Sequence, residues 1–497
     1  MLTVMLFLPL AVALLVAALP KGLAAPLSVG GSIATLVLSV VLVFDFDAGV
    51  PGIQHVVDET WIPDLGVRFQ LGIDGISLFL IVMTALLWTA SFAWSAWRQP
   101  ERRKNYFLML GIGEFAVLGA FLAQDLLLFV LFFDLMLVPF FFLIGAYGSG
   151  DRVRATIKMM VYTLVGSLLM LVAAIATAIL TSDQTGELSF AMADLRANVL
   201  PEGSQDWIFI FFAAAFLVKM PAFPLHGWMP DAYRSAPLPV LALLSGVLPK
   251  VAAYGFLRVA LPIFPDATIQ LQELVLVLAL ASILYGSVMA FTQTNARLIA
   301  GYSSIAQLGF ITLGVFSLNA GGADGAVLQM VNHGLVVAPI FFIIALLAER
   351  YGTDDIRAMG GAAIRAPVLA ALFLIVTLAM LAMPGSANFI GEFYILNALF
   401  DEKTAYAVVA MAGVAMAAFY ALRLYQRTMH NRLPDGCLSR EMSVRDGFVL
   451  VPLVLVIVAL ALYPSLILKR GEASIQDKVG AVAAAQQAER DDVAVVP

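Results

Sequence analysis

Long apolar runs recur along the whole chain and limit its fold more than any other feature of the sequence. Each run holds roughly 20 residues, which as a helix crosses a hydrocarbon core about 30 Å thick. Charged residues make up only 12% of the 497, against about a quarter in soluble proteins, because lipid does not solvate ionised side chains. We predict an all-α, polytopic membrane protein with about fourteen transmembrane helices, at residues 2–20, 27–44, 71–96, 105–123, 126–147, 157–180, 207–226, 238–262, 272–292, 296–317, 325–348, 367–394, 405–425 and 447–468.

The loops between these runs differ in charge, which predicts the orientation of the chain. The first run follows no basic segment and precedes a second run closely, so it reads as a span and not as a cleaved signal peptide. Lysine and arginine concentrate in alternate loops, and the other loops are acidic. By the positive-inside rule the basic loops are cytoplasmic, so both termini face the outer side. The alanine-rich composition fits a multi-pass protein of the bacterial inner membrane. The tail from Arg470 should lie along the surface or fray.

Two of the runs are interrupted by proline at similar places, Pro221 in the seventh and Pro384 in the twelfth. Proline removes a backbone donor and clashes with the preceding turn, so each helix should break there. Breaks five spans apart predict two inverted five-helix repeats, a pattern found in transporters. The chain then divides into 1–96 (the first three helices), 97–262 (first repeat), 263–426 (second repeat) and 427–497 (last helix and tail). Two ordinary proline kinks are the alternative.

Four ionisable residues lie well inside apolar runs: Asp134, Lys219, Lys250 and Glu392. Each charge costs roughly 2.5–3.5 kcal/mol at the centre of a span, so a partner, water or neutralisation must offset it. A neutral Lys219 would leave Asp134 free to take a proton, and a charged Lys219 would hold it ionised. The alternatives are a structural ion pair for Asp134 and Lys219, snorkelling for Lys250, and a headgroup position for Glu392.

Less costly polar groups accompany these charges. His333 can both donate and accept a hydrogen bond near neutral pH, although a lone buried histidine is often only structural. Gln307, Ser303, Ser304 and Tyr302 share the tenth run and could orient water without titrating. Arg258 and Asp74 stand near the ends of their runs and should mark the membrane interface.

The sequence also lacks the patterns of several other chemistries. It has no glycine-rich phosphate loop, no CxxC and no nucleophile elbow. Its four histidines have no ligand partners at helical spacing, and the single cysteine, Cys437, forms no internal disulfide. A net charge of −6 spread over the chain indicates no nucleic-acid partner. We expect no metal, no cofactor and no redox centre on this chain.

Several blocks of the sequence resemble the antiporter-like subunits of respiratory complex I, the proton-translocating NADH:quinone oxidoreductase. In chain order they are LFFDLMLVPFFFLIGAYG (131–148), LVKMPAFPLHGWMPDAYRSAP (217–237), GVLPKVAAYGFLR (246–258), LIAGYSSIAQLGF (298–310), QMVNHGL (329–335) and MPGSANFIGEF (383–393). The resemblance covers nearly the whole chain. The last block has glutamate at position 392, as in M-type subunits, where the L and N types carry lysine.

This resemblance implies one proton channel, with Asp134, Lys219, Lys250, His333 and Glu392 as its titratable residues. It implies partners among the L- and N-type and small membrane subunits, with NADH, FMN, iron–sulfur clusters and quinone bound by other chains. The sequence departs from the family at three positions. Asp134 stands where glutamate is usual, and Gln307 and Tyr233 stand where histidine is usual.

Three other functions remain open from the sequence. Subunits of multisubunit cation/proton antiporters and of membrane-bound hydrogenases share this architecture. A solute transporter would use the two broken helices as its substrate site, although the Lys–His–Glu series argues against that function. A scaffold subunit would keep the charges without using them.

Overall fold

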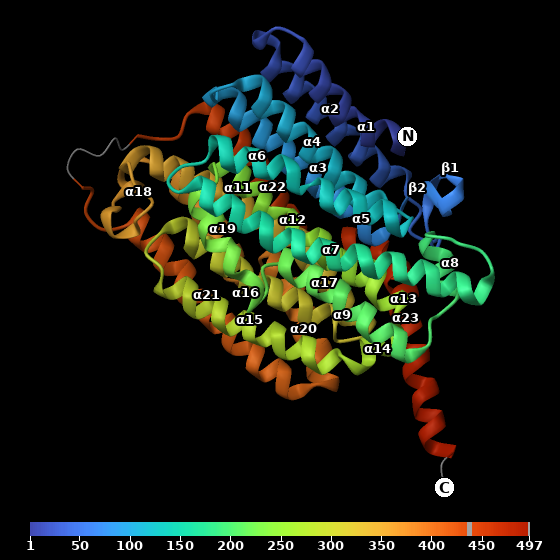
Figure 1. Cartoon of the computed structure of the whole chain (residues 1–497). Helices are drawn as coiled ribbons and strands as arrows, with labels where there is room; N and C mark the ends of the chain where they lie inside the picture. Colours follow the sequence, from blue (N-terminus) through green and yellow to red (C-terminus); the bar gives the residue numbers. More distant parts are fainter. Residues whose placement is uncertain (435–439, 496–497) are drawn as a thin grey trace.

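The protein, described here from a computed structural model that covers residues 1–434 and 440–495, is a bundle of helices with one small hairpin (Figure 1). The prediction of an all-α membrane fold is confirmed. Cys437 lies outside the described residues. The elements are α1 (Leu2–Ala18), η1 (Lys21–Leu23), α2 (Ala24–Asp45), β1 (Gln54–Ile62), η2 (Pro63–Leu65), β2 (Val67–Ile73), α3 (Gly75–Arg98), α4 (Arg103–Leu122), α5 (Leu126–Leu135), α6 (Leu137–Tyr147), α7 (Arg152–Thr185), α8 (Met192–Ala197), α9 (Glu202–Lys219), η3 (Leu225–Trp228), α10 (Met229–Ser235), α11 (Leu238–Gly246), α12 (Leu248–Gly255), η4 (Phe256–Ala260), α13 (Leu261–Ile263), α14 (Pro265–Gln270), α15 (Gln272–Thr292), α16 (Ala296–Val315), α17 (Ala320–Tyr351), η5 (Ile356–Ala358), α18 (Ala362–Arg365), α19 (Pro367–Met380), α20 (Ala387–Glu402), α21 (Thr404–Met429), α22 (Val444–Leu462) and α23 (Ser465–Val495).

Every predicted apolar run falls mainly on helix, although the run 71–96 begins in strand β2 and the run 207–226 extends past the end of α9. Within the described residues, eleven helical segments are long and apolar enough to cross a membrane, some of them joined from two or more of these helices. The other three runs fall on the shorter apolar helices α1 and α19, the latter continued by α20, and on α9, which ends at the first proline break. The count of fourteen spans and the inverted repeats remain predictions.

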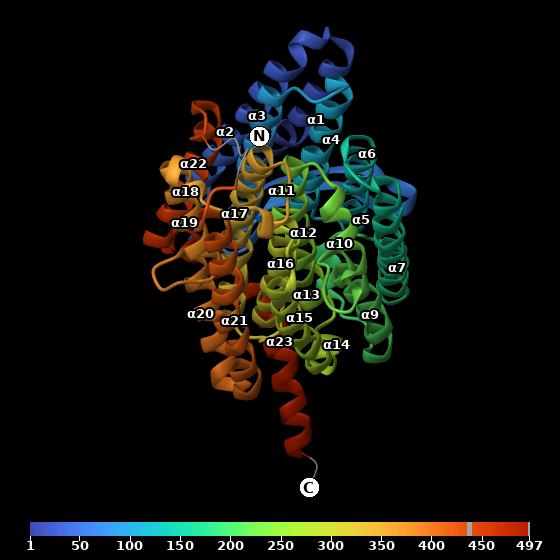
Figure 2. The ribbon, with the colours of Figure 1, turned by 90° about the vertical axis from the view of Figure 1, so that its left-hand side faces the viewer.

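Helices α16 and α17 and the segment from α11 to α13 form the centre of the bundle. The most apolar stretch of each is 100% buried, whereas α2, α7, α15, α21 and α22 bury less than half of theirs. Figure 2 shows α7 and α9 on one flank and α19 and α22 on the other, with α16 and α17 between them. Lys250, Gln307 and His333 all belong to the central helices, so protein and not lipid surrounds them.

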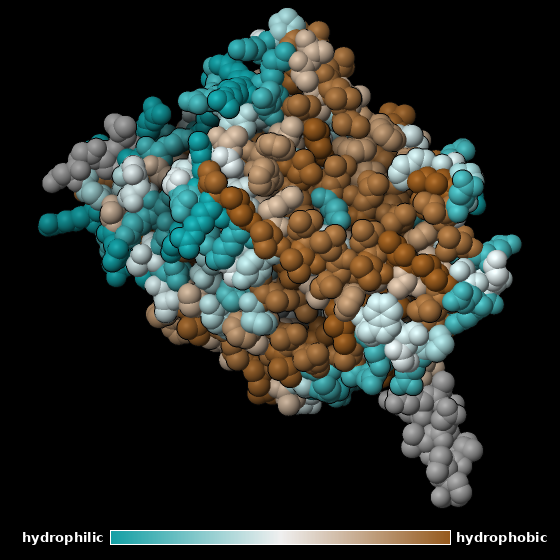
Figure 3. Space-filling model, in the orientation of Figure 1, coloured by the Kyte–Doolittle hydropathy of each residue, from teal (hydrophilic) through white to brown (hydrophobic). Residues whose placement is uncertain are grey.

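A broad apolar surface crosses the middle of the molecule and gives way to polar residues at both ends (Figure 3). On α7 it consists of a stripe of exposed aliphatic side chains that includes Ile157, Val161, Val165, Leu168, Val172 and Ile179. An exposed apolar area of this extent is typical of a membrane protein, because in water it would drive aggregation. The chain is therefore an integral membrane protein.

Both proline breaks occur where the sequence predicts them. Helix α9 ends at Lys219 before Pro221, and helix α19 ends at Met380, four residues before Pro384, with the chain resuming as α20 at Ala387. Ser386 caps α20 by accepting a hydrogen bond from the Phe389 amide. A further interruption was not predicted: α11 and α12 are separated at Val247, just before Lys250.

One end of the bundle carries two elements that the sequence analysis did not predict. Strands β1 and β2 pair as an antiparallel hairpin in a segment expected to be a loop. Its turn places Gly66 at a φ of 63°, a value that suits glycine. The tail is also more ordered than predicted, because it forms the long helix α23, which packs against α3, α14 and α17. The N-terminus and helix α23 lie at this end (Figure 1).

Candidate functional site

Lys250 and His333 are in direct contact at the centre of the bundle. The Lys250 ammonium lies 2.8 Å from Nδ1 of His333 and donates a second hydrogen bond of 2.8 Å to the Ser245 carbonyl. Lys250 is completely buried, and His333 is 3% exposed. The Ser245 carbonyl can accept this bond because the helix is interrupted at Val247. The break therefore supplies the backbone acceptor that a buried ammonium needs.

Two glycines allow the helices of this contact to approach each other. A Cβ added to Gly334 would lie 2.7 Å from the Gly246 carbonyl oxygen and 2.3 Å from the Met83 sulfur. Such distances are too short for any side chain, so α11 and α17 meet backbone to backbone beside His333. The glycine after His333 thus sets the distance between α17 and α11.

The predicted water-orienting residues of α16 divide into two groups. The Ser304 hydroxyl lies 3.1 Å from the Ser245 hydroxyl, next to the carbonyl that holds Lys250, and so joins the Lys250 cluster. Ser303 donates to the Ala300 carbonyl of its own helix. Tyr302 packs against the rings of His226 and Tyr285. Among the described residues, neither Ser303 nor Tyr302 makes a hydrogen bond to a predicted proton carrier.

Glu392 ends a short chain of side-chain hydrogen bonds. Gln307 donates to Oε1 of Glu392 at 2.7 Å, and Gln329 donates to Oε1 of Gln307 at 2.6 Å. All three residues are at most 3% exposed, which excludes a headgroup position for Glu392. Gly391 makes room for this chain, since a Cβ there would lie 2.5 Å from Oε1 of Gln329. Gln307 thus contacts the carboxyl group directly.

Buried polar groups that the sequence analysis missed accompany His333 on α17 and Glu392 on α20. Within the described part of the chain, Oδ1 of Asn332, both amide atoms of Asn388 and the Tyr420 hydroxyl have no hydrogen-bond partner. Asn332 precedes His333 on α17, Asn388 stands one turn before Glu392 on α20, and Tyr420 lies within electrostatic reach of Glu392. Buried polar atoms without protein partners are usually satisfied by ordered water. An asparagine inside an apolar run was the available signal.

Lys219 and Asp134 lie close together without forming an ion pair among the described residues. The Lys219 ammonium donates to the Phe133 carbonyl at 3.2 Å and lies 4.6 Å from the centre of the Phe133 ring. Asp134 is near enough for its charge to act on Lys219, yet its Oδ1 has no hydrogen-bond partner. Ser167 of α7 faces the same carboxyl group. The two predicted residues are therefore neighbours, but no direct hydrogen bond or ion pair holds them together in the described structure.

Lys219 and Lys250 are separated mainly by aromatic side chains. Phe216, on the last turn of α9, packs against Phe256, and a Cβ at Gly255 would lie 2.6 Å from the Phe216 ring. Among the described residues, no hydrogen bond joins the two lysines. An electrostatic influence of one lysine on the other needs no such bond.

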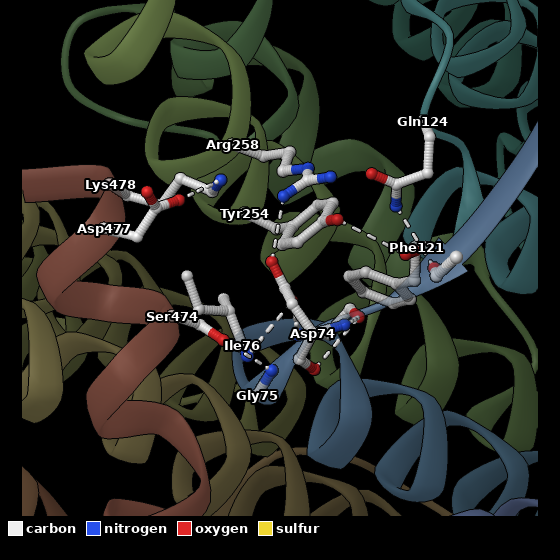
Figure 4. A network of polar contacts seen from close by, with 12 residues as sticks. Asp74, Gly75, Ile76, Phe121, Gln124, Tyr254, Arg258, Ser474, Asp477 and Lys478 are labelled. Carbon is white, nitrogen blue, oxygen red and sulfur yellow. Dashed lines mark hydrogen bonds and ion pairs between the residues drawn. The ribbon is translucent and has the colours of Figure 1, made fainter. Parts of the chain in front are cut away.

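Asp74 and Arg258, expected at the membrane interface, form a buried ion pair. Their Oδ2 and Nη1 atoms are 3.0 Å apart, and both side chains are at most 4% exposed. The other carboxylate oxygen of Asp74 caps α3 by accepting from the amides of Ile76 and Ser77. Figure 4 shows this pair beside Lys478 of α23. It lies apart from the Lys250 cluster and makes no contact with it.

Several known proteins are similar to this chain in sequence, in structure or in both. The family described as NADH:quinone oxidoreductase/Mrp antiporter, TM, matches residues 123–418. The chain is 36% identical to NADH-quinone oxidoreductase subunit M of Rhodobacter capsulatus over 483 residues, or 94% of each protein. A chain of respiratory complex I from Thermus thermophilus has a TM-score of 0.88 at 31% identity, with 97% of this chain and 100% of that chain covered. The Mrp complex from Dietzia, at 20% identity and a TM-score of 0.85, shares the fold.

Proposed function

The chain belongs to the NADH:quinone oxidoreductase/Mrp antiporter transmembrane family, and from this we propose that it is the M-type, proton-translocating subunit of a bacterial complex I. The observation that carries this proposal is the 2.8 Å contact between Lys250 and His333 at the buried centre of the bundle. A lysine and a histidine joined by one hydrogen bond can exchange a proton without either charge meeting lipid.

The proposed route has three parts. Lys219 and Asp134 form the input unit, in which the protonation of one controls the charge of the other. Lys250 and His333 form the central exchange. Glu392, held by Gln307, is the carboxyl group on the exit side. Water joins the last two parts past the unpaired polar atoms of Asn332 and Asn388.

Electrostatic interaction is the way in which Lys219 and Lys250 influence each other in this proposal. The aromatic packing around Phe216 excludes water, and charges interact more strongly in such a medium than in water. A proton placed on Lys219 therefore disfavours a second charge on Lys250. Each proton moved against the membrane potential requires about 2.3 kcal/mol per 100 mV, which electron transfer in other subunits would supply.

The remaining features of the proposal follow from the same assignment. Both termini face the outer side of the bacterial inner membrane. The fourth to eighth predicted spans (97–262) and the ninth to thirteenth (263–426) form two inverted repeats. The L- and N-type and small membrane subunits are its partners. NADH, FMN, iron–sulfur clusters and quinone bind to other chains, and this chain itself holds no cofactor.

A second candidate is an antiporter subunit, favoured only by the shared fold of the Mrp complex. Purification of the native complex distinguishes the two functions. Copurifying NADH-binding and iron–sulfur subunits support complex I, whereas an assembly without redox subunits supports the antiporter.

The proposed function is tested with Lys219→Ala in the native membrane. We expect NADH-driven proton pumping by inverted vesicles to fall while the complex still assembles on native gels. Lys403→Ala is the matched control, because Lys403 pairs with Glu273 away from the buried residues. Normal pumping by Lys219→Ala contradicts the proposed route, and loss of assembly alone indicates a scaffold.

A further inference from the structure

A cationic cavity of about 380 Å³ lies at the end of the bundle that carries the hairpin. Arg196 of α8, Arg258 of η4 and Lys478 of α23 all line it. The sequence places few lysines and arginines on this side, so the convergence of three from distant segments is notable. None of them takes part in the proposed proton route.

Arg258 is the innermost of these cations. It sits on a π-helical turn, η4, a distortion that is frequent at functional sites. Only 5% of the residue is exposed. Its Nη1 pairs with Asp74, but its Nε has no hydrogen-bond partner among the described residues. A buried guanidinium N–H without an acceptor is costly, and an occupant of the cavity could accept from it.

The cavity has more cationic side chains than carboxylates that form ion pairs with them. Asp477 accepts hydrogen bonds from Arg196 at 2.6 and 2.9 Å and from Lys478 at 2.8 Å, while Asp74 serves Arg258. Two carboxylates thus face three cations, which leaves one positive charge. Burial and the nearby charge of Arg258 lower the pKa of Lys478, as expected where like charges are held together.

The walls of the cavity are fixed by the surrounding fold. The Gly75 amide donates to the Ser474 hydroxyl at 3.0 Å, and a Cβ at Gly75 would lie 1.8 Å from the Arg470 carbonyl oxygen. Helix α23 therefore lies directly on the start of α3, as Figure 4 shows. Apolar side chains also line the cavity, namely Ile53, Val56, Met192 and Ile263.

We propose that this cavity binds the phosphodiester of an anionic phospholipid, with the phosphate between Arg258, Arg196 and Lys478. Arginine is well suited to phosphate because its planar N–H groups donate in parallel to two oxygens. The apolar side chains of the lining suit the glycerol backbone and the first methylenes of an acyl chain. An amphiphile is favoured over a free anion because cationic and apolar side chains line the same cavity, in a protein embedded in lipid.

The test uses the intact, purified complex and a photoactivatable phosphatidylglycerol. Peptide mass spectrometry maps the cross-links, which are expected within residues 52–56, 192–196 and 258–263. Arg196→Gln combined with Lys478→Gln should reduce this labelling by about tenfold or more, the effect expected from losing charge-assisted hydrogen bonds. Arg258 is left intact because its partner Asp74 is almost completely buried, whereas Asp477, the partner of Arg196 and Lys478, is partly exposed to water. Lys403→Gln, also expected on the outer side but outside the cavity, should label as the unaltered complex does.

Three results would overturn the proposal. The first is equal labelling of the double variant and the control. The second is loss of labelling when inorganic phosphate is added as a competitor at the same concentration as the photoactivatable lipid, which would indicate a free-anion site. The third is an experimental map of the complex that places an acidic side chain of a neighbouring subunit against Arg258. Density for a phosphate about 3 Å from Nε of Arg258 would support the proposal.

Discussion

The Lys250 ammonium and Nδ1 of His333 lie 2.8 Å apart, with neither side chain in contact with lipid. Nδ1 accepts the hydrogen bond when Lys250 is charged, so the histidine proton is then on Nε2. If Lys250 gives up its proton to His333, the charge moves from α12 to α17 without leaving the buried centre. We therefore propose that His333 is the residue that passes the proton towards Glu392.

Replacement of His333 by glutamine should stop this transfer while retaining an acceptor for Lys250. The glutamine carbonyl can take the hydrogen bond, but the amide does not titrate. We expect proton pumping to fall by about 10²-fold or more, the usual contribution of a positioned acid–base group. Pumping by proteoliposomes measures the effect, and a fully active His333→Gln would show that His333 only positions Lys250.

Gly334→Ala tests the close approach of α11 and α17. The added Cβ would meet the Gly246 carbonyl at 2.7 Å and move α17 away, which lengthens the Lys250–His333 contact. Overpacking of this kind costs about 1–3 kcal/mol, so thermal stability and pumping should both decrease. Gly22→Ala is the control, because nothing lies within 4 Å of the added carbon. Unchanged pumping in Gly334→Ala would show that the spacing is not critical.

Gln307 should be replaceable by histidine but not by leucine. Leucine leaves the buried Glu392 carboxyl group without its amide donor, a loss of about 1–3 kcal/mol when no water substitutes. Histidine, the usual residue of the family here, restores a donor. We expect Gln307→Leu to lower both melting temperature and pumping, and Gln307→His to retain both. Similar pumping by the two variants would place Gln307 outside the route.

Asp134→Glu should be tolerated, whereas Asp134→Asn should be nearly inactive. The longer side chain adds about 1.5 Å of reach, which favours closer pairing with Lys219. Asparagine removes the charge that controls the protonation of Lys219. The NADH-driven pH gradient distinguishes the variants. A gradient in Asp134→Asn as large as in the unaltered protein would remove Asp134 from the input unit.

The contact between Asp477 and Arg196 predicts a pH-dependent stability at the end of the bundle that carries the hairpin. Hydrogen bonds from Arg196 hold the pKa of Asp477 well below its usual range. The ionised form therefore stabilises the fold at neutral pH, and this contribution is lost as the pH falls below about 4. Asp477→Asn should melt about 1–2 °C lower at pH 7, because the pair is partly exposed and screened. A difference that persists unchanged in acid would refute the assignment.

The sequence was sufficient to predict an all-α membrane fold and the burial of the main charged residues. Apolar length and proline position are local signals, and the cost of a buried charge does not depend on the exact fold. These signals placed Lys219, Lys250 and Glu392 correctly at buried positions on helices.

Other features depend on contacts between distant segments and were not predictable. The hairpin was missed because most side chains of β1 are partly or fully exposed on both faces, so no alternating apolar pattern marks it. The Asp74–Arg258 pair joins residues 184 apart, and each alone resembles an interfacial residue. Helix α23 forms from a polar stretch whose order depends on packing against α3 and α17.

The most direct test of the proton route is the number of protons pumped per NADH oxidised by reconstituted Lys250→Met complex. Methionine keeps much of the length of the side chain but carries no proton. We predict a ratio clearly below that of the unaltered complex, with normal assembly and a normal ratio in Lys403→Met. A ratio equal to that of the unaltered complex would contradict the proposal that protons pass through Lys250.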